Sequence, residues 1–182
     1  NGASTTNGAN VQTYTLNKSN AQKWKLSEVK YATPEEGTYT ISTALSTNKV
    51  LDIASGSTND GANVQLYEKN GTTAQNFVIK KVSDYEYQIT CQKSGKALDV
   101  AGASANAGTN VWQYSKNNSE AQKWRFVDAG NGYYYIISNL GTALDVNAAG
   151  TANGTNVQAY TWNKSSAQKW KLVDASNDDN ST

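Results

Sequence analysis

Histidine is absent from this chain of 182 residues, and cysteine and proline occur once each, as Cys91 and Pro34. Without histidine the chain lacks the commonest general base and the commonest metal ligand of enzymes. A single cysteine cannot form an intrachain disulfide. No apolar run approaches the ~18 residues that a membrane-spanning helix requires. These absences argue against a catalytic, metal-binding or membrane-inserted protein, and we expect no cofactor.

Charge is also scarce. Charged residues make up 17% of the chain and nearly cancel, leaving a net charge of +1. Because no run of basic residues is present, we expect neither nucleic acid nor an anionic membrane as a partner. Asn, Thr, Ser, Gly and Tyr are abundant instead, which is typical of exported bacterial surface proteins. We predict a secreted or cell-surface location, although the lone cysteine by itself would favour a reducing compartment.

A short phrase that recurs at fixed spacing organises the chain. In its three full copies, Leu-Asp-Val or Leu-Asp-Ile is followed by Asn-Val and then by Gln-x-Trp or Gln-x-Phe. The Asp precedes the Asn by 11 positions, and the Asn precedes the Gln by 12. The recurring residues are Asp52, Asp99 and Asp145, then Asn10, Asn63, Asn110 and Asn156, then Gln22, Gln75, Gln122 and Gln168. Such regularity indicates one structural unit repeated along the chain.

Each full repeat contains four short runs in which apolar and polar residues alternate, separated by turn sequences such as Asp60-Gly61. The predicted strands are 37–43, 49–54, 62–68 and 76–82, then 85–92, 96–101, 110–116 and 122–127, then 133–138, 142–147, 156–162 and 168–173. The sequence thus predicts an all-β protein of about twelve strands, with two more in the half repeat. Three copies bury their apolar faces best around a pseudo-threefold axis, because a propeller needs at least about four blades.

The chain begins with only the back half of a repeat, in residues 1–26. Residues 27–36, which contain Pro34, then break the rhythm and are interpreted as a linker. We therefore divide the chain into a half repeat of an upstream unit plus linker (1–35), a three-repeat domain (36–175) and a polar tail (176–182). The three repeats cover about 37–82, 85–128 and 132–174.

The half repeat has two alternative roles. It is either the tail of an upstream domain, which the linker favours, or it pairs with the front half of the third repeat in a permuted closure that releases 151–182. An orphaned half repeat can also exchange between chains, so a dimer through this segment is a further expectation.

The Gln-x-Trp signature, preceded by Leu-Asp-Val and Asn-Val-Gln, resembles the ricin-type β-trefoil lectins, and most closely the disulfide-free carbohydrate-binding modules attached to bacterial secreted enzymes and toxins. The resemblance covers 37–174 and the half repeat in 1–26. It implies a six-stranded barrel capped by three hairpins, with one shallow sugar pocket in each repeat. In such a pocket a carboxylate accepts hydroxyl hydrogen bonds and an aromatic ring packs against the sugar's C–H face.

The resemblance assigns pocket residues in each repeat. In the first repeat it implies Asp52 as the hydroxyl acceptor, Gln65 as its polar neighbour and Tyr67 as the stacking ring. The third repeat matches with Asp145, Gln158 and Tyr160. The second repeat keeps Asp99 and Tyr114 but has Trp112 in the Gln position, where it either blocks the pocket or widens its apolar floor. The half repeat retains Gln12 and Tyr14 without an Asp, so we expect no working site there.

One departure recurs in every copy. The Asn that the family places before Gln-x-Trp is alanine here, at Ala21, Ala74, Ala121 and Ala167. This change removes one sugar hydrogen bond, of a kind worth about 0.5–1.5 kcal/mol. Asn63, Asn110 and Asn156 are candidates to compensate, and Asn63 and Asn156 therefore belong to the predicted sugar-binding set.

Structural roles compete with binding roles for several of these residues. The motif aromatics Trp24, Phe77, Trp124 and Trp170 are expected in the core, as is Cys91, and Gln75, Gln122 and Gln168 are expected to tie the Asp loop to its strand. The three Asp residues themselves could instead bond turn amides. Trp162, which has no aromatic counterpart in the other repeats, is a candidate additional platform.

The sequence favours a non-catalytic carbohydrate-binding module that is weak per site, strengthened by multivalency, and targets a secreted parent protein to glycans. Galactose-containing glycans and plant or mucin polysaccharides are the candidate ligands. Two alternatives remain: a structural or protein-interaction trefoil with decayed sugar sites, and one unit of an adhesin array. The acids recur one per repeat, which argues against the paired carboxylates of a glycosidase. A catalytic domain elsewhere in the parent protein is compatible with each of these interpretations.

Overall fold

The computed structural model describes residues 2–5, 9–26 and 28–177, and its described part contains thirteen strands, all paired antiparallel. The strands are β1 (Tyr31–Ala32), β2 (Gly37–Thr43), β3 (Lys49–Ile53), β4 (Ala62–Glu68), β5 (Asn76–Lys81), β6 (Tyr87–Cys91), β7 (Ala97–Val100), β8 (Thr109–Tyr114), β9 (Trp124–Gly130), β10 (Tyr133–Ser138), β11 (Ala143–Val146), β12 (Thr155–Tyr160) and β13 (Lys169–Asp174). All twelve strands predicted in the three full repeats are present. No helix in this part of the chain is long and apolar enough to cross a membrane.

The short helices are single 3-10 turns: η1 (Asn20–Gln22), η2 (Ala54–Gly56), η3 (Thr73–Gln75), η4 (Ala101–Ala103), η5 (Glu120–Gln122), η6 (Asn147–Ala149), η7 (Ser166–Gln168) and η8 (Ala175–Asn177). Most of them recur in step with the repeat. One turn follows the Leu-Asp-Val/Ile strand of each full repeat, and another carries the motif Gln. Of the predicted tail 176–182, residues 178–182 lie outside the described part of the chain.

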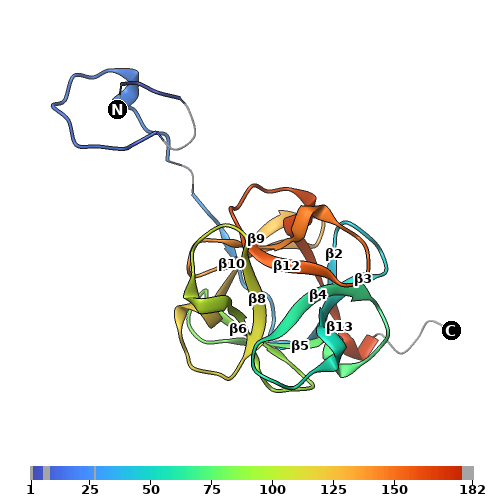
Figure 1. The fold of residues 1–182 in the computed structure, drawn as a ribbon. Helices are drawn as coiled ribbons and strands as arrows, with labels where there is room; N and C mark the ends of the chain where they lie inside the picture. Colours follow the sequence, from blue (N-terminus) through green and yellow to red (C-terminus); the bar gives the residue numbers. More distant parts are fainter. Residues whose placement is uncertain (1, 6–8, 27, 178–182) are drawn as a thin grey trace.

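Six strands close a barrel, and three hairpins cap one end of it. The barrel pairings are β2–β5, β5–β6, β6–β9, β9–β10, β10–β13 and β13–β2. The cap consists of the hairpins β3–β4, β7–β8 and β11–β12, whose second strands pair with one another around the pseudo-threefold axis. In Figure 1, β4, β8 and β12 surround the centre of the body. This is the predicted β-trefoil with three four-stranded repeats.

The motif aromatics of the full repeats fill the barrel core. Phe77, Trp124 and Trp170 are fully buried, and Cys91 is buried with them, as predicted. The indole nitrogens of Trp124 and Trp170 donate to the backbone carbonyls of Leu98 (3.2 Å) and Leu144 (2.9 Å). Each of these tryptophans therefore fills core volume and also ties its barrel strand to the Leu-Asp-Val strand of the same repeat.

Three asparagines close a ring of hydrogen bonds where the repeats meet. The Nδ2 of Asn63 donates to Oδ1 of Asn156 (2.9 Å), Asn156 donates to Asn110 (3.0 Å), and Asn110 donates to Asn63 (3.0 Å). Each side chain thus makes one donated and one accepted bond with the other two. This arrangement satisfies polar groups at the junction of the three repeats, where an unpaired amide would be costly.

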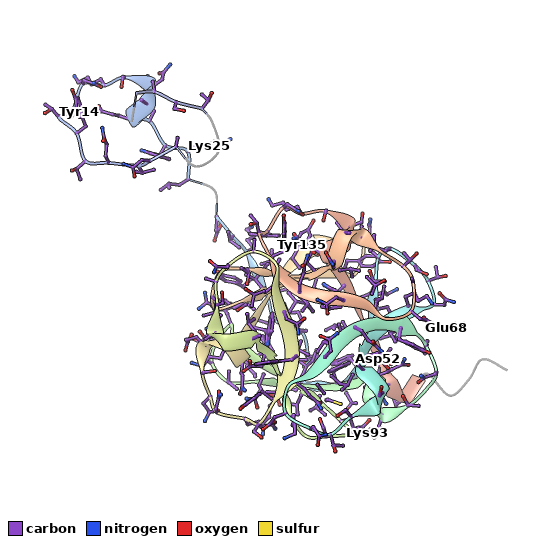
Figure 2. The ribbon with its side chains drawn as sticks, viewed as in Figure 1. Tyr14, Lys25, Asp52, Glu68, Lys93 and Tyr135 are labelled. Atoms are coloured by element: carbon purple, nitrogen blue, oxygen red, sulfur yellow. The ribbon has the colours of Figure 1, made fainter. Side chains whose placement is uncertain are left out.

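The N-terminal half repeat lies apart from this body in Figures 1 and 2. Its described residues contain the turn η1 but no strand, so the two strands predicted here are not formed. The prediction that Trp24 is a core residue is also wrong, because its side chain is 71% exposed. The motif residue is intact, but no barrel strand lies beside it to cover the indole.

The half repeat nevertheless keeps the local loop of the full repeats. Gln22 Oε1 accepts the backbone N–H groups of Asn17 (2.8 Å) and Lys18 (3.1 Å), as Gln168 Oε1 does with Asn163 (2.9 Å) and Lys164 (3.1 Å). The loop conformation is therefore set by local bonds, whereas burial of the aromatic needs the rest of a trefoil.

The predicted linker is partly built into the body. β1 pairs with β9, the hydroxyl of Tyr87 donates to the carbonyl of Pro34 (3.3 Å), and the backbone N–H of Lys81 donates to Glu36 (2.8 Å). The third repeat is closed by its own β12 and β13, which pair with β11 and β10. The permuted closure with the half repeat is therefore not the arrangement adopted.

Candidate functional site

Each capping hairpin places the predicted acid opposite its predicted neighbour. Asp52 on β3 is the direct cross-strand partner of Gln65 on β4, and Asp145 on β11 is the partner of Gln158 on β12. In the second hairpin Asp99 faces Trp112. Directly opposed residues of an antiparallel pair project from the same face, and a residue two positions further on projects from that face as well. The hairpin geometry therefore places Tyr67, Tyr114 and Tyr160 beside these pairs.

The three carboxylates are held by side-chain donors. Asp52 Oδ1 accepts Nε2 of Gln65 (2.8 Å), and Asp145 Oδ1 accepts Nε2 of Gln158 (2.9 Å). In the second repeat the indole N–H of Trp112 takes the place of the amide and donates to Asp99 Oδ1 at 2.7 Å. The position opposite the acid thus supplies a donor in every repeat, whether it is Gln or Trp.

The Gln of Gln-x-Trp supplies the second donor, as predicted. Gln122 Nε2 donates to Asp99 Oδ2 (2.9 Å) and to the carbonyl of Ser115 (3.0 Å). Gln75 and Gln168 donate to the corresponding carbonyls of Glu68 (2.9 Å) and Thr161 (2.9 Å), and each acts on the acid of its repeat to lower the pKa of that acid. These glutamines therefore join the acid to the loop that follows the second hairpin strand. Because a carboxylate has about four acceptor positions, each acid retains capacity for ligand hydroxyls.

Burial shapes the electrostatics of these acids. Asp52, Asp99 and Asp145 are only 5–6% exposed, and Figure 2 labels Asp52 within the body. Burial raises the pKa of Asp52 and Asp145, because it disfavours the charged form, while the two glutamine hydrogen bonds on each carboxylate act to lower that pKa.

Two pockets open onto these groups. The third-repeat pocket has a volume of about 320 Å³ and is lined by Asp145, Asn147, Gln158, Tyr160, Asn163 and Ala167, among others. The second-repeat pocket has a volume of about 370 Å³ and is lined by Asp99, Gly102, Ala103, Trp112, Tyr114, Asn117, Ser119 and Ala121. Tyr67, Tyr114 and Tyr160 are 36–39% exposed, so each offers part of its ring to the solvent side.

Asn117 and Asn163 are pocket residues that sequence reasoning missed. Asn163 accepts the backbone N–H of Ser165 (2.9 Å), and Asn117 accepts that of Ser119 (3.0 Å). The signal is present in the sequence, because an Asn recurs five positions before the motif Gln in every copy, at Asn17, Asn70, Asn117 and Asn163. By itself this recurrence predicts only exposed turns, since the local pattern does not reveal that the turns face the acid.

Ala121 and Ala167 line the pockets where the family pattern has an asparagine, so a ligand finds a methyl group there instead of an amide. Asn63 and Asn156 were predicted to compensate for this loss. Their side chains instead bond one another and Asn110 on the axis. Neither is among the residues that line the two pockets described above.

The two unusual tryptophans have different surroundings. Trp112 does not fill its pocket but forms one wall of it, stacked on Tyr114 with ring centroids 5.8 Å apart and planes inclined by 29°. Trp162 is half-buried, edge-on to Tyr135 at 5.7 Å, with the ammonium of Lys164 5.2 Å from its ring centroid. Trp112 thus lines an open pocket, whereas Trp162 packs against protein groups.

Three capping hairpins, each with one buried acid and one part-exposed tyrosine, on a six-stranded barrel define a β-trefoil of the lectin type. The chain belongs to the family described as ricin-type beta-trefoil lectin domain-like, whose profile matches residues 1–67, 73–160 and 137–182. No group of three or more metal-ligating side chains occurs in the part of the chain that the structure describes.

Solved structures with the same fold are numerous. A designed threefold symmetric protein, ThreeFoil, is 42% identical, with a TM-score of 0.74 over 76% of this chain and 99% of that one. An exo-β-1,3-galactanase from Clostridium thermocellum is 34% identical, with a TM-score of 0.73 over 77% of this chain but only 30% of that enzyme. The Rhizoctonia solani agglutinin is 26% identical, with a TM-score of 0.70 over 79% and 98%. No curated protein sequence matches the chain.

Proposed function

We propose that this protein binds carbohydrate without catalysing a reaction, through the Asp–aromatic sites of its three hairpins. The observation that carries this proposal is a buried carboxylate, held by the amide of Gln158, that lines an open pocket beside a part-exposed tyrosine. Two hydroxyls of one sugar bind the remaining carboxylate positions through charge-assisted hydrogen bonds. The tyrosine ring then covers an apolar C–H face of the sugar.

In this proposal the first site consists of Asp52, Gln65, Tyr67 and Asn70, and the third of Asp145, Gln158, Tyr160 and Asn163. The second site consists of Asp99, Trp112, Tyr114 and Asn117. The matching segment of the galactanase belongs to an enzyme that acts on a β-1,3-galactan, which supports a galactose-containing glycan as the ligand. The likeness to a fungal agglutinin supports sugar binding in general.

Three sites on one rigid body make the protein multivalent. The second engagement with a polymer is intramolecular, which raises avidity without new contacts. Each site is weak, since the pocket is open and the alanines remove one hydrogen bond. Such a module suits the attachment of a secreted or cell-surface parent protein to a glycan-coated surface.

The alternative is a trefoil with a structural or protein-binding role and decayed sugar sites, which the alanines at Ala74, Ala121 and Ala167 favour. A glycan array of the wild type beside Asp52→Ala and Asp145→Ala proteins separates the two. We expect wild-type binding that weakens in both variants. If the wild type binds no glycan, the alternative holds. If both variants bind unchanged while folded, the assignment of the binding sites to Asp52 and Asp145 fails.

As the pH is lowered, sugar affinity should fall at a higher pH than the one at which the protein unfolds. Protonation of Asp52 or Asp145 removes a charged acceptor, and their raised pKa values place this loss above the ordinary value of 3.8. A raised pKa in the folded state means that the fold takes up these protons more readily than the unfolded chain. These two groups therefore add stability at low pH and lose it as the pH rises through the folded pKa.

Calorimetric titration of the protein with galactobiose between pH 7 and pH 4 measures this effect, with circular dichroism as the control for folding. An affinity that stays constant down to the unfolding pH would contradict the assignment of the two carboxylates.

Dimerisation through the half repeat stays a prediction. Val11, Tyr14, Leu16, Trp24 and Leu26 are each more than 70% exposed in this segment, whereas Val64, Val111 and Val157, the counterparts of Val11, are fully buried. Sedimentation velocity over a range of concentrations tests it. We expect self-association that Trp24→Ser weakens, and a monomer at all concentrations would rule the dimer out.

A further inference from the structure

We propose that the second-repeat pocket selects a sugar that carries a methyl group, while the first and third sites take a fully hydroxylated hexose. The methyl can belong to a 6-deoxyhexose or to the acetyl group of an N-acetylhexosamine, which present the same apolar group to the protein. This inference rests on the proposed carbohydrate binding and concerns which sugar each site accepts. Three differences between the second and third pockets carry it.

The first difference is the number of polar atoms left for a ligand opposite the acid. Gln158 donates one N–H to Asp145, which leaves its carbonyl oxygen and a second N–H for a ligand. Trp112 has a single donor and no acceptor, and that donor is used on Asp99 at 2.7 Å. A ligand hydroxyl at this place finds a partner in the third pocket but an indole ring in the second, where it loses its water without replacement.

The second difference is the apolar area. Trp112 and Tyr114 both line the second pocket and stack at 5.8 Å, so two rings form one continuous platform. A turn of the neighbouring repeat also lies near the indole. An added Cβ at Gly61, in the turn before β4 with φ +77°, would lie in ordinary van der Waals contact with Trp112 Cε3, at 3.7 Å. At the third pocket the corresponding neighbour is Gly108, in the turn before β8 of the second repeat, where an added Cβ would lie 3.9 Å from Gln158 Oε1.

The third difference lies in the turn after the acid. Gly102 and Ala103 line the second pocket and bring no polar side chain, whereas Asn147 lines the third. One wall of the second pocket is therefore aromatic and another is small and apolar. A methyl group of the ligand has apolar contacts on both sides there, but a hydroxyl in the same position has none of the partners that the third pocket offers.

The anchoring chemistry is shared by both pockets. Asp99 accepts one hydrogen bond on each oxygen, from Trp112 and from Gln122, and keeps about two acceptor positions for vicinal hydroxyls. The diol thus binds in every repeat, and discrimination comes from the opposite side of the sugar. Covering one methyl group on the rings corresponds to about fourfold tighter binding.

The test uses the full chain and follows each pocket separately by nuclear magnetic resonance. The indole N–H of Trp112 reports the second pocket and the backbone amide of Asn163 reports the third. Galactose, 6-deoxygalactose and N-acetylgalactosamine are titrated in turn. We expect one of the two methyl-bearing sugars to bind the second pocket about fourfold more tightly than galactose does. The third pocket should show no such gain. Comparison of 6-deoxygalactose with N-acetylgalactosamine identifies which of the two methyl groups the second pocket binds.

Two reciprocal substitutions complete the test. Trp112→Gln should abolish the methyl preference of the second pocket, followed at the amide of Asn117, and Gln158→Trp should confer that preference on the third. Equal ranking of the sugars by both pockets in the wild type would overturn the inference, even if a variant failed to fold. So would an unchanged preference in folded Trp112→Gln. If no pocket responds to any sugar, both this inference and the proposed carbohydrate binding are wrong.

Discussion

Trp170→Ala should lower the free energy of unfolding by about 3–5 kcal/mol, the range seen when a large buried side chain is truncated. Trp170 is fully buried in the barrel, and its indole N–H donates to the carbonyl of Leu144 at 2.9 Å. The substitution leaves both a cavity and an unpaired buried carbonyl on the strand that carries Asp145. For a domain of this size the expected fall in melting temperature is roughly 6–20 °C.

The matched control is Trp24→Ala, which changes the same motif residue in the half repeat. Because Trp24 is exposed, the unfolding free energy should stay within about 0.5 kcal/mol of the wild type. Urea denaturation of both proteins measures the two values side by side. Equal destabilisation by the two substitutions would mean that the half repeat is packed into a trefoil in solution, contrary to the structure.

Asp145→Asn should weaken sugar binding at the third site by about 10- to 100-fold, because a hydrogen bond to a charged group contributes about 1.5–3 kcal/mol. The substitution preserves shape but replaces one acceptor oxygen by a donor, which then faces the amide of Gln158 or Gln168. Calorimetric titration with galactobiose, in a protein whose first and second sites are already inactivated by Asp52→Asn and Asp99→Asn, isolates this effect.

Asp84→Asn serves as the control, since Asp84 is an exposed acid in the turn between β5 and β6. It should leave affinity unchanged. A third-site affinity that Asp145→Asn does not alter, in a folded protein, would show that the carboxylate does not contact the sugar.

Strand positions were largely predictable because alternation and turn residues are local signals. The strand predicted over 37–43 is β2 (Gly37–Thr43), and the run predicted over 122–127 is β9, which begins at Trp124 and continues to Gly130. The difference arises because Glu120–Gln122 forms a 3-10 turn whose Gln side chain reaches Asp99. Whether a Gln belongs to a strand or to a turn depends on a contact 23 residues away in the chain.

Contacts between repeats were not predictable in the same way. Asn63 and Asn156 recur beside the predicted pocket residues, so the sequence assigned them to sugar binding. Their side-chain amides instead hydrogen-bond each other on the threefold axis, although the two residues are 93 positions apart in the chain. The repeated pattern reveals that these residues are equivalent, but equivalent residues also meet wherever a symmetry axis passes. Trp24 matches the core tryptophans in sequence but is exposed, because a motif aromatic is buried only where the strands that cover it are present.

A crystal structure of this protein soaked with galactobiose is the decisive test of carbohydrate binding at the three acids. We expect a sugar in the third pocket with vicinal hydroxyls on the Asp145 carboxylate and one face against Tyr160, and an equivalent sugar on Asp52 and Tyr67. Sugar bound away from all three acids, or no sugar at a saturating concentration, would contradict it.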